Sequence, residues 1–357
     1  MKVALVVPDL DGAGAQRVML DLAAGMVERG VEVDVVAVRG EGPLRRLVPP
    51  GATVVDLGAR RAVSAVAPLV GYLRRARPDA VVSCLNHVNL VTIAATRVAR
   101  TGAIVMVTQH NQLSSSAPRK DTRRARAMPA LLRVGFRFAD RVVAVSDGVA
   151  DDLARTIGLA RNRIAVIYNP VDVARLRAAA AAPTDVVWPD GDGAKLLGVG
   201  RLIEQKDFPN LLRALAALPT ARLVLLGDGE DRVALGALAA ELGVAARVCF
   251  AGFVDNPFPV FAAADVFVLS SRWEGLPTVL IEALALSPHV VATDCPSGPR
   301  EILDGGRWGH LVPVGDPAAL AEAIAACVTE SPVEASEALA RYDRATVTTR
   351  YLELLAT

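Results

Sequence analysis

The 357-residue chain has few of the features that mark disulfide-bonded, zinc-binding or membrane-spanning proteins. Its four cysteines are far apart and show no Cys-x-x-Cys or Cys/His metal spacing, which argues against a disulfide scaffold or a metal site and fits a reducing cytoplasm. No stretch of about 18 apolar residues lacks charges, so no transmembrane helix is expected. The opening apolar run, Val3 to Val7, is too short for a signal peptide.

The chain as a whole also lacks an excess of one charge sign. Its 39 Lys and Arg against 38 Asp and Glu leave a net charge of +1, which argues against a nucleic-acid partner. This balance conceals a division, because residues 1–180 hold 26 basic and 15 acidic side chains, a net of +11. Residues 181–357 hold 13 and 23, a net of −10, so we expect two parts of opposite charge.

Apolar residues are abundant, and their pattern predicts the fold. The chain is 52% hydrophobic, and its length predicts about two domains. Near-continuous apolar runs separated by helical stretches are typical of parallel sheets covered on both faces. The expected strands are 3–7, 31–38, 53–57, 80–83, 104–108, 142–145 and 164–167, then 196–200, 223–226, 248–251, 266–269, 290–292 and 311–312. We therefore predict an α/β protein of two doubly wound parallel-sheet domains around a cleft.

The break between the two series of strands predicts a domain boundary. Residues 178–193 are an alanine run followed by prolines and an Asp-Gly turn cluster, which is typical of a linker. We predict an N-terminal domain over 1–182 and a C-terminal domain over 183–335. Residues 336–357 are expected to form a C-terminal helix that crosses back to the N-terminal domain.

Two segments after strands favour phosphate binding. Small residues at 12–15 precede a helix, where backbone N–H groups can approach a phosphate, although a tight turn explains them equally well. Arg201 and Lys206 lie in one loop after a strand of the acidic half, a pair that suits a diphosphate. The alternative is that both are solvated surface charges.

A third segment, 270–282, combines carboxylates with a helix start near Thr278. Glu274 lies in the loop and Glu282 one turn into the helix, whose N-terminus attracts phosphate. Carboxylates this close to a phosphate would repel it unless they bind neutral hydroxyls, so sugar hydroxyls are their natural partners. A fourth candidate is His110, at the end of a strand, for which a capped loop histidine is the alternative.

These segments together resemble the retaining GT-B glycosyltransferases of family 4, glycosyl transferases group 1, over nearly the whole chain. Glu274 and Glu282 reproduce the E-x7-E spacing of that family. The segments that carry the resemblance are GAGAQR (12–17), SDGVADDL (146–153), YNPVD (168–172), GRLIEQKDF (200–208), LGDGE (226–230), GFVDNP (252–257), ADVFVLSSRWEGLPTVLIEAL (264–284) and TDCPSGPREIL (293–303).

The resemblance implies a role for each matching residue. Glu274 would bind hydroxyls of the donor sugar, Glu282 would bind ribose hydroxyls, and Arg201 and Lys206 would neutralise the diphosphate. His110 would lie near the donor sugar, between the two domains. The other implied donor contacts are Gly14, Gly200, Phe253 beside the base, Gly275, Leu276, Pro277, and Thr278 and Val279 at the helix N-terminus.

The implied activity is metal-independent transfer of a sugar with retention of its anomeric configuration. No metal and no cofactor are implied beyond the nucleotide-sugar co-substrate. The segment 296–302 resembles relatives that use UDP-activated galacto- or gluco-configured sugars, often N-acetylated.

A basic amphipathic stretch over 117–141 favours contact with an anionic membrane surface, although a solvated helix face on the N-terminal domain is the alternative. We expect a cytoplasmic protein, peripheral on the inner leaflet, that acts on a lipid-linked glycan precursor. The open alternatives are a small soluble acceptor such as an antibiotic aglycone, a nucleotide-sugar epimerase, or a non-catalytic nucleotide-sugar-binding protein. The basic candidates for membrane or acceptor contact are Arg119, Lys120, Arg123, Arg124 and Arg126.

Overall fold

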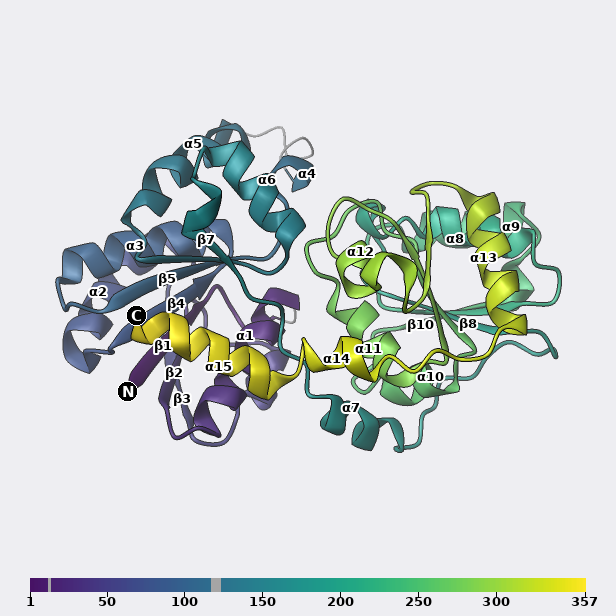
Figure 1. The fold of residues 1–357 in the computed structure, drawn as a ribbon, viewed down its shortest axis with the longest axis horizontal. Coiled ribbons are helices and arrows are strands. Elements are labelled where there is room, and N and C mark those ends of the chain that lie inside the picture. Colours follow the sequence, from purple (N-terminus) through teal and green to yellow (C-terminus); the bar gives the residue numbers. More distant parts are fainter. Residues whose placement is uncertain (12–13, 117–122) are drawn as a thin grey trace. The chain divides into compact units, whose positions relative to one another are not determined.

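The computed structural model describes residues 1–11, 14–116 and 123–357. They divide into two compact units, each with its own sheet (Figure 1). The first unit comprises Met1–Pro170 and Tyr342–Thr357, and the second comprises Val171–Arg341. The first holds 26 basic and 16 acidic residues and the second 13 and 22, so the division of charge follows the fold.

The first unit is built on a seven-stranded parallel sheet in the order β3-β2-β1-β4-β5-β6-β7. Its strands are β1 (Lys2–Val7), β2 (Glu32–Ala37), β3 (Ala52–Asp56), β4 (Ala80–Cys84), β5 (Ile104–Gln109), β6 (Arg141–Ala144) and β7 (Ile164–Val166). Its helices include α1 (Gly14–Val27), α2 (Val66–Ala76), α3 (Asn86–Ala99), α4 (Leu113–Ser116), α5 (Arg123–Gly135), α6 (Asp147–Ile157) and α15 (Arg344–Ala356).

Both faces of this sheet are covered, which explains its near-continuous apolar strands. After its first residue, Lys2, β1 consists only of apolar residues, and residues 3–7 are all fully buried. Alternate residues of β1 pack into separate clusters, Leu5 with Leu22 of α1 in one and Val6 with Leu69 of α2 in the other. The central strand therefore contributes to two cores, one on each side of the sheet.

The second unit is built on a six-stranded parallel sheet in the order β10-β9-β8-β11-β12-β13. Its strands are β8 (Lys195–Val199), β9 (Arg222–Leu226), β10 (Val248–Gly252), β11 (Val266–Leu269), β12 (His289–Thr293) and β13 (His310–Val312). Its helices include α7 (Val173–Ala180), α8 (Phe208–Ala216), α9 (Arg232–Glu241), α10 (Phe258–Ala263), α11 (Thr278–Leu286), α12 (Pro299–Ile302), α13 (Pro317–Thr329) and α14 (Ser336–Ala340). The prediction of two doubly wound parallel sheets is confirmed.

The boundary between the units differs from the prediction of 1–182 and 183–335. The division falls after Pro170, because α7 packs on α10 and α11 of the second unit. Leu176 of α7 is buried there, and Asn256 Nδ2 donates to Ala179 O at 2.8 Å. The alanine-rich stretch therefore begins within the second unit.

The C-terminal region 336–357 is two helices rather than the predicted single one. α14 contacts α11 of the second unit, whereas α15, yellow in Figure 1, packs on α1 of the first. Asp343 separates them by capping α15, where its side chain accepts from Thr346 N at 3.2 Å. Arg344 then pairs at 2.6 Å with Glu28, the residue directly after α1, which adds a contact between α15 and the rest of the first unit.

Candidate functional site

The candidate site lies at the carboxyl edge of the second sheet, where the strand order changes direction between β8 and β11. Loops after strands at such a point form the usual ligand crevice of doubly wound folds. The loop after β8 and the loop after β11 are joined there by hydrogen bonds to the backbone. Arg272 N donates to Gln205 O at 2.8 Å, and Ser270 Oγ donates to Lys206 O at 2.7 Å.

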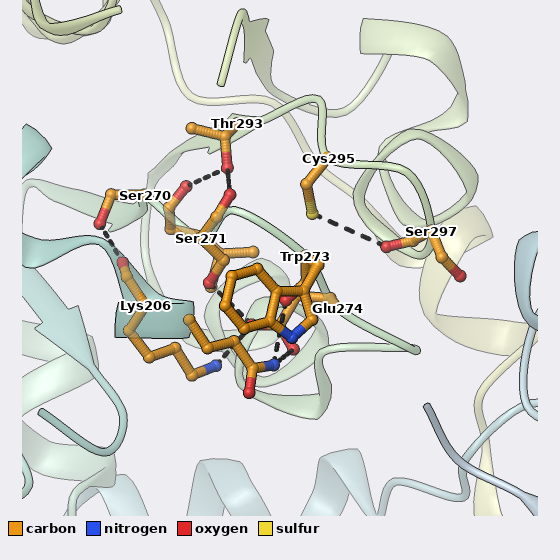
Figure 2. A network of polar contacts seen from close by, with 10 residues as sticks. Lys206, Ser270, Ser271, Trp273, Glu274, Thr293, Cys295 and Ser297 are labelled. Atoms are coloured by element: carbon orange, nitrogen blue, oxygen red, sulfur yellow. Dashed lines mark hydrogen bonds and ion pairs between the residues drawn. The ribbon is translucent and has the colours of Figure 1, made fainter. Parts of the chain in front are cut away.

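An ion pair between Lys206 and Glu274 is the centre of this arrangement (Figure 2). Lys206 Nζ lies 2.6 Å from Glu274 Oε1, and the two side chains are 15% and 8% exposed. Ser271 Oγ donates to the same carboxylate oxygen at 2.7 Å. Gln205 Nε2 donates to the other oxygen, Oε2, at 3.3 Å, and to Trp273 O at 3.0 Å. The structure thus brings together two of the predicted site residues, as a buried charge pair with additional neutral donors.

The loop after β12 supports the loop that carries Glu274. Ser297 Oγ donates to Gly275 O at 2.7 Å. Gly298 has a φ of 92°, and a Cβ there would lie 2.5 Å from Pro277 Cδ. Only glycine fits this close approach at a left-handed position. The predicted donor-loop residues therefore rest on a tightly packed second loop.

The N-terminus of α11 follows this loop directly. Its N-cap residue, Pro277, offers no side-chain hydrogen bond to the first turn, which begins at Thr278. Backbone N–H groups at a helix N-terminus favour an anion such as a phosphate. Glu282 lies one turn further on, 8% exposed, on the same helix. Val279 and Leu276 complete the segment that the sequence assigned to the donor.

The other predicted donor residues surround these loops or lie in the first unit. Gly200 follows β8 with a φ of 152°, and Arg201 beside it is exposed and makes no ion pair with any residue that the structure describes. Phe253, after β10, is 73% exposed. Gly14 belongs to the first unit, where it begins α1, and a Cβ there would meet no described atom within 4 Å.

His110 lies in the first unit, directly after β5, on a buried polar network. Thr108 Oγ1 lies 2.8 Å from His110 Nε2 and donates its proton to Ser83 O at 2.9 Å. Nε2 must therefore carry a hydrogen in the neutral ring, which leaves Nδ1 as an acceptor. Burial lowers the pKa of His110 to about 4, so the ring is neutral near pH 7. His110 can act as a neutral hydrogen-bonding group but not as a cation there.

The predicted membrane-contact residues are only partly described. Arg119 and Lys120 lie outside the described residues, as do the side chains of Arg123 and Arg124. Arg126, on α5, is exposed. Apolar side chains on this helix and the short turn after it differ in burial. Leu132 and Phe136 are buried, whereas Leu131, Val134 and Phe138 are 52%, 59% and 56% exposed.

Neither a metal cluster nor a membrane span is found among the described residues. Over residues 1–11, 14–116 and 123–357, no three His, Cys, Asp or Glu side chains gather as metal ligands would. In the same ranges, no helix is both long and apolar enough to cross a membrane. Metal independence stays a prediction.

Sequence reasoning missed the residues that support Glu274. Ser271 and Gln205 stand within the quoted motifs, but neither was assigned a role, and Thr293 and Ser297 were also passed over. Ser271 lies three residues before Glu274 in the same loop, a local spacing that could have indicated the contact. Gln205, Thr293 and Ser297 give no such signal, because their contacts join loops that are far apart in sequence.

Comparison with known proteins identifies the family of the chain. A family model described as Glycosyltransferase Family 4 matches residues 12–175, and one described as Glycosyl transferases group 1 matches residues 193–330. The chain therefore belongs to the GT-B glycosyltransferases of these two families.

Particular relatives share parts of the chain. The lipopolysaccharide core biosynthesis glycosyltransferase LpsE of Rhizobium meliloti is 36% identical over 228 residues, which are 62% of this chain and 65% of that protein. An N-acetylgalactosamine-N,N'-diacetylbacillosaminyl-diphospho-undecaprenol 4-alpha-N-acetylgalactosaminyltransferase of Campylobacter jejuni is 35% identical over 185 residues, 52% of this chain and 49% of the relative. The matches thus span about half to two thirds of the relatives' lengths.

A solved structure extends the likeness to the whole chain. The crystal structure of Anabaena Alr3699/HepE in complex with UDP superposes with a TM-score of 0.79 at 22% identity, covering 100% of both chains. At this identity, the likeness establishes the fold.

Proposed function

We propose that the protein is a retaining glycosyltransferase that moves a hexose or N-acetylhexosamine from a UDP-sugar to a hydroxyl of a lipid-linked glycan precursor. The Lys206–Glu274 pair at the carboxyl edge of the second sheet carries the proposal. A carboxylate there can accept hydrogen bonds from sugar hydroxyls, while the neighbouring ammonium and the N-terminus of α11 attract a diphosphate.

The chemistry places its greatest demand on the leaving group. The bond between the sugar C1 and the diphosphate oxygen breaks, and negative charge grows on the departing UDP. Lys206, Arg201 and the N-terminus of α11 would stabilise that charge, which is how positioned cations and dipoles accelerate such steps. For retention, the acceptor hydroxyl would attack C1 from the leaving-group side and give its proton to the departing phosphate oxygen. This route needs no nucleophile from the protein.

Three points support UDP as the nucleotide. The Anabaena structure was solved with UDP, and Phe253 offers an exposed ring at the same carboxyl edge of the sheet. The third is the family resemblance, in which the segment 296–302 implies a UDP-sugar donor. Exposed aromatic rings can stack on a base.

Two of the relatives support a glycan acceptor carried on lipid. One acts in lipopolysaccharide core biosynthesis and another on a diphospho-undecaprenol substrate. The net charge of +10 on the first unit and the exposed apolar side chains of α5 and the turn after it favour contact with an anionic membrane.

The test of activity is transfer by the purified full chain, with and without EDTA. UDP-glucose, UDP-galactose and their N-acetylated 2-amino forms are each offered with a lipid-diphosphate-linked saccharide or a water-soluble saccharide. We expect one donor to be consumed with the lipid-linked acceptor, with the anomeric configuration kept and EDTA without effect. Failure of every donor would overturn the proposal, and transfer to the soluble saccharide alone would overturn its acceptor.

The test of membrane contact is flotation with anionic and neutral vesicles. We expect the wild type to float with anionic vesicles, and the variant Leu131→Ser, Val134→Ser and Phe138→Ser to float less. Val63→Ser is the control, because Val63 is an 80% exposed apolar residue elsewhere in the same unit. Equal recovery of wild type in the soluble fraction with both vesicles would contradict the proposal.

A further inference from the structure

The carboxylate of Glu274 is held by donors of two kinds. Lys206 and Ser271 share Oε1, at 2.6 and 2.7 Å, and Gln205 reaches Oε2 at 3.3 Å. A carboxylate offers about four lone-pair positions, so one position on Oε2 remains for a ligand hydroxyl. Lys206 is charged, whereas the other two donors are neutral.

The two neutral donors are anchored independently of Lys206 Nζ. Ser271 is fully buried, and its own carbonyl accepts from Thr293 Oγ1 at 2.5 Å (Figure 2). Gln205 also donates to Trp273 O, at 3.0 Å. Both side chains are neutral, so an anion that enters the site does not attract them as it attracts a cation. The flexible stem of Lys206, by contrast, allows its charged Nζ to turn toward the anion.

We propose that Ser271 and Gln205 are positioning residues, which keep the Glu274 carboxylate in its sugar-binding position when the charge of Lys206 is drawn to the donor diphosphate. The inference rests on the proposed donor site. The inference separates recognition of the sugar from recognition of the nucleotide, since Ser271 and Gln205 would affect the sugar through Glu274 and would not affect the nucleotide.

The experiment compares binding of UDP with binding of the tightest of the four UDP-sugars. Ser271→Ala and Gln205→Met each remove one donor. We expect UDP affinity to stay within about twofold of wild type. We expect affinity for the UDP-sugar, and kcat/KM, to fall about 10- to 100-fold for Ser271→Ala, as for loss of a hydrogen bond to a charged group.

Three further variants separate positioning from folding. Ser287→Ala is the matched control, because Ser287 is buried in the same unit and its hydroxyl donates to Phe261 O at 2.8 Å. It should bind both ligands as wild type does. Ser271→Thr keeps the hydroxyl and should restore sugar affinity. In a Glu274→Ala background, Ser271→Ala should cause no further loss.

The outcomes distinguish this inference from the proposed function. If the wild type turns over the UDP-sugar but Ser271→Ala and Gln205→Met match it, only the positioning role is overturned. Equal losses of UDP and UDP-sugar affinity would likewise overturn it, because they indicate a general structural effect. If the wild type binds no UDP-sugar, both the function and the inference fail.

Discussion

Replacing Lys206 by methionine would test how strongly the buried ion pair contributes to the second unit. The change keeps most of the side-chain volume but leaves the Glu274 carboxylate, in a residue 6% exposed, without its cation. Removal of one partner from a buried pair costs about 3–5 kcal/mol. Since Ser271 and Gln205 still donate to the carboxylate, we expect a smaller loss of unfolding free energy, about 2–3 kcal/mol.

The tryptophans make this loss measurable in the second unit alone. All three, Trp188, Trp273 and Trp308, lie in that unit, so urea unfolding followed by their fluorescence reports on it selectively. The double variant Lys206→Met, Glu274→Gln removes both charges and should regain most of the lost stability. Donor turnover should remain low in both variants, because stability needs only that no charge is left unpaired, whereas catalysis needs the ammonium of Lys206 at the diphosphate.

Two results would refute this reasoning. One is an unfolding midpoint of Lys206→Met equal to that of wild type. The other is a double variant less stable than the single one, because a carboxylate left unpaired would then not be the source of the loss.

Three other changes have defined outcomes. Phe253→Ala should weaken UDP binding by about 1–3 kcal/mol through lost base stacking, while urea unfolding stays unchanged. Calorimetric titration measures the affinity, and an affinity equal to that of wild type would show that the ring does not stack on the base. Gly298→Ala should destabilise the second unit by about 1–3 kcal/mol, because its Cβ would collide with Pro277, and tryptophan fluorescence measures this loss. Burial lowers the pKa of His110 from 6.5 to about 4, so the unfolded chain binds a proton at this ring more readily than the folded chain does. The unfolding free energy of the first unit should therefore fall by about 3 kcal/mol as the pH drops from 6.5 to 4. Hydrogen exchange of β5 should show a smaller fall in His110→Gln, and an identical pH dependence would contradict this assignment.

The fold followed from the sequence because strands such as β1 and β11 are buried on both faces and are therefore almost wholly apolar. The unit boundary did not follow, because the residues of α7 resemble a linker in composition and only their packing on α10 and α11 assigns them to the second unit. The sequence also did not reveal the break between α14 and α15 at Asp343, because the capping role of Asp343 is evident only from its hydrogen bond to Thr346 N.

Parts of the site could also be predicted. Residue type and position after strands selected Lys206 and Glu274, and the structure places them in contact. The contact of Gln205 with Glu274 depends on the approach of two loops, which the spacing along the sequence does not reveal. Ser271 is three residues from Glu274, but its contact becomes evident only from the conformation of that loop. The tautomer of His110 likewise depends on Thr108 and Ser83, from two neighbouring strands.

The central claim is that the second unit binds a nucleoside diphosphate sugar, with Glu274 on the sugar. The most direct measurement is calorimetric titration of UDP and the four UDP-sugars into the wild type and Glu274→Ala. We predict that the wild type binds one UDP-sugar more tightly than UDP, and that Glu274→Ala keeps UDP affinity but loses the added affinity of the sugar. Absence of binding to the wild type, or equal affinity of both proteins for the UDP-sugar, would contradict the claim.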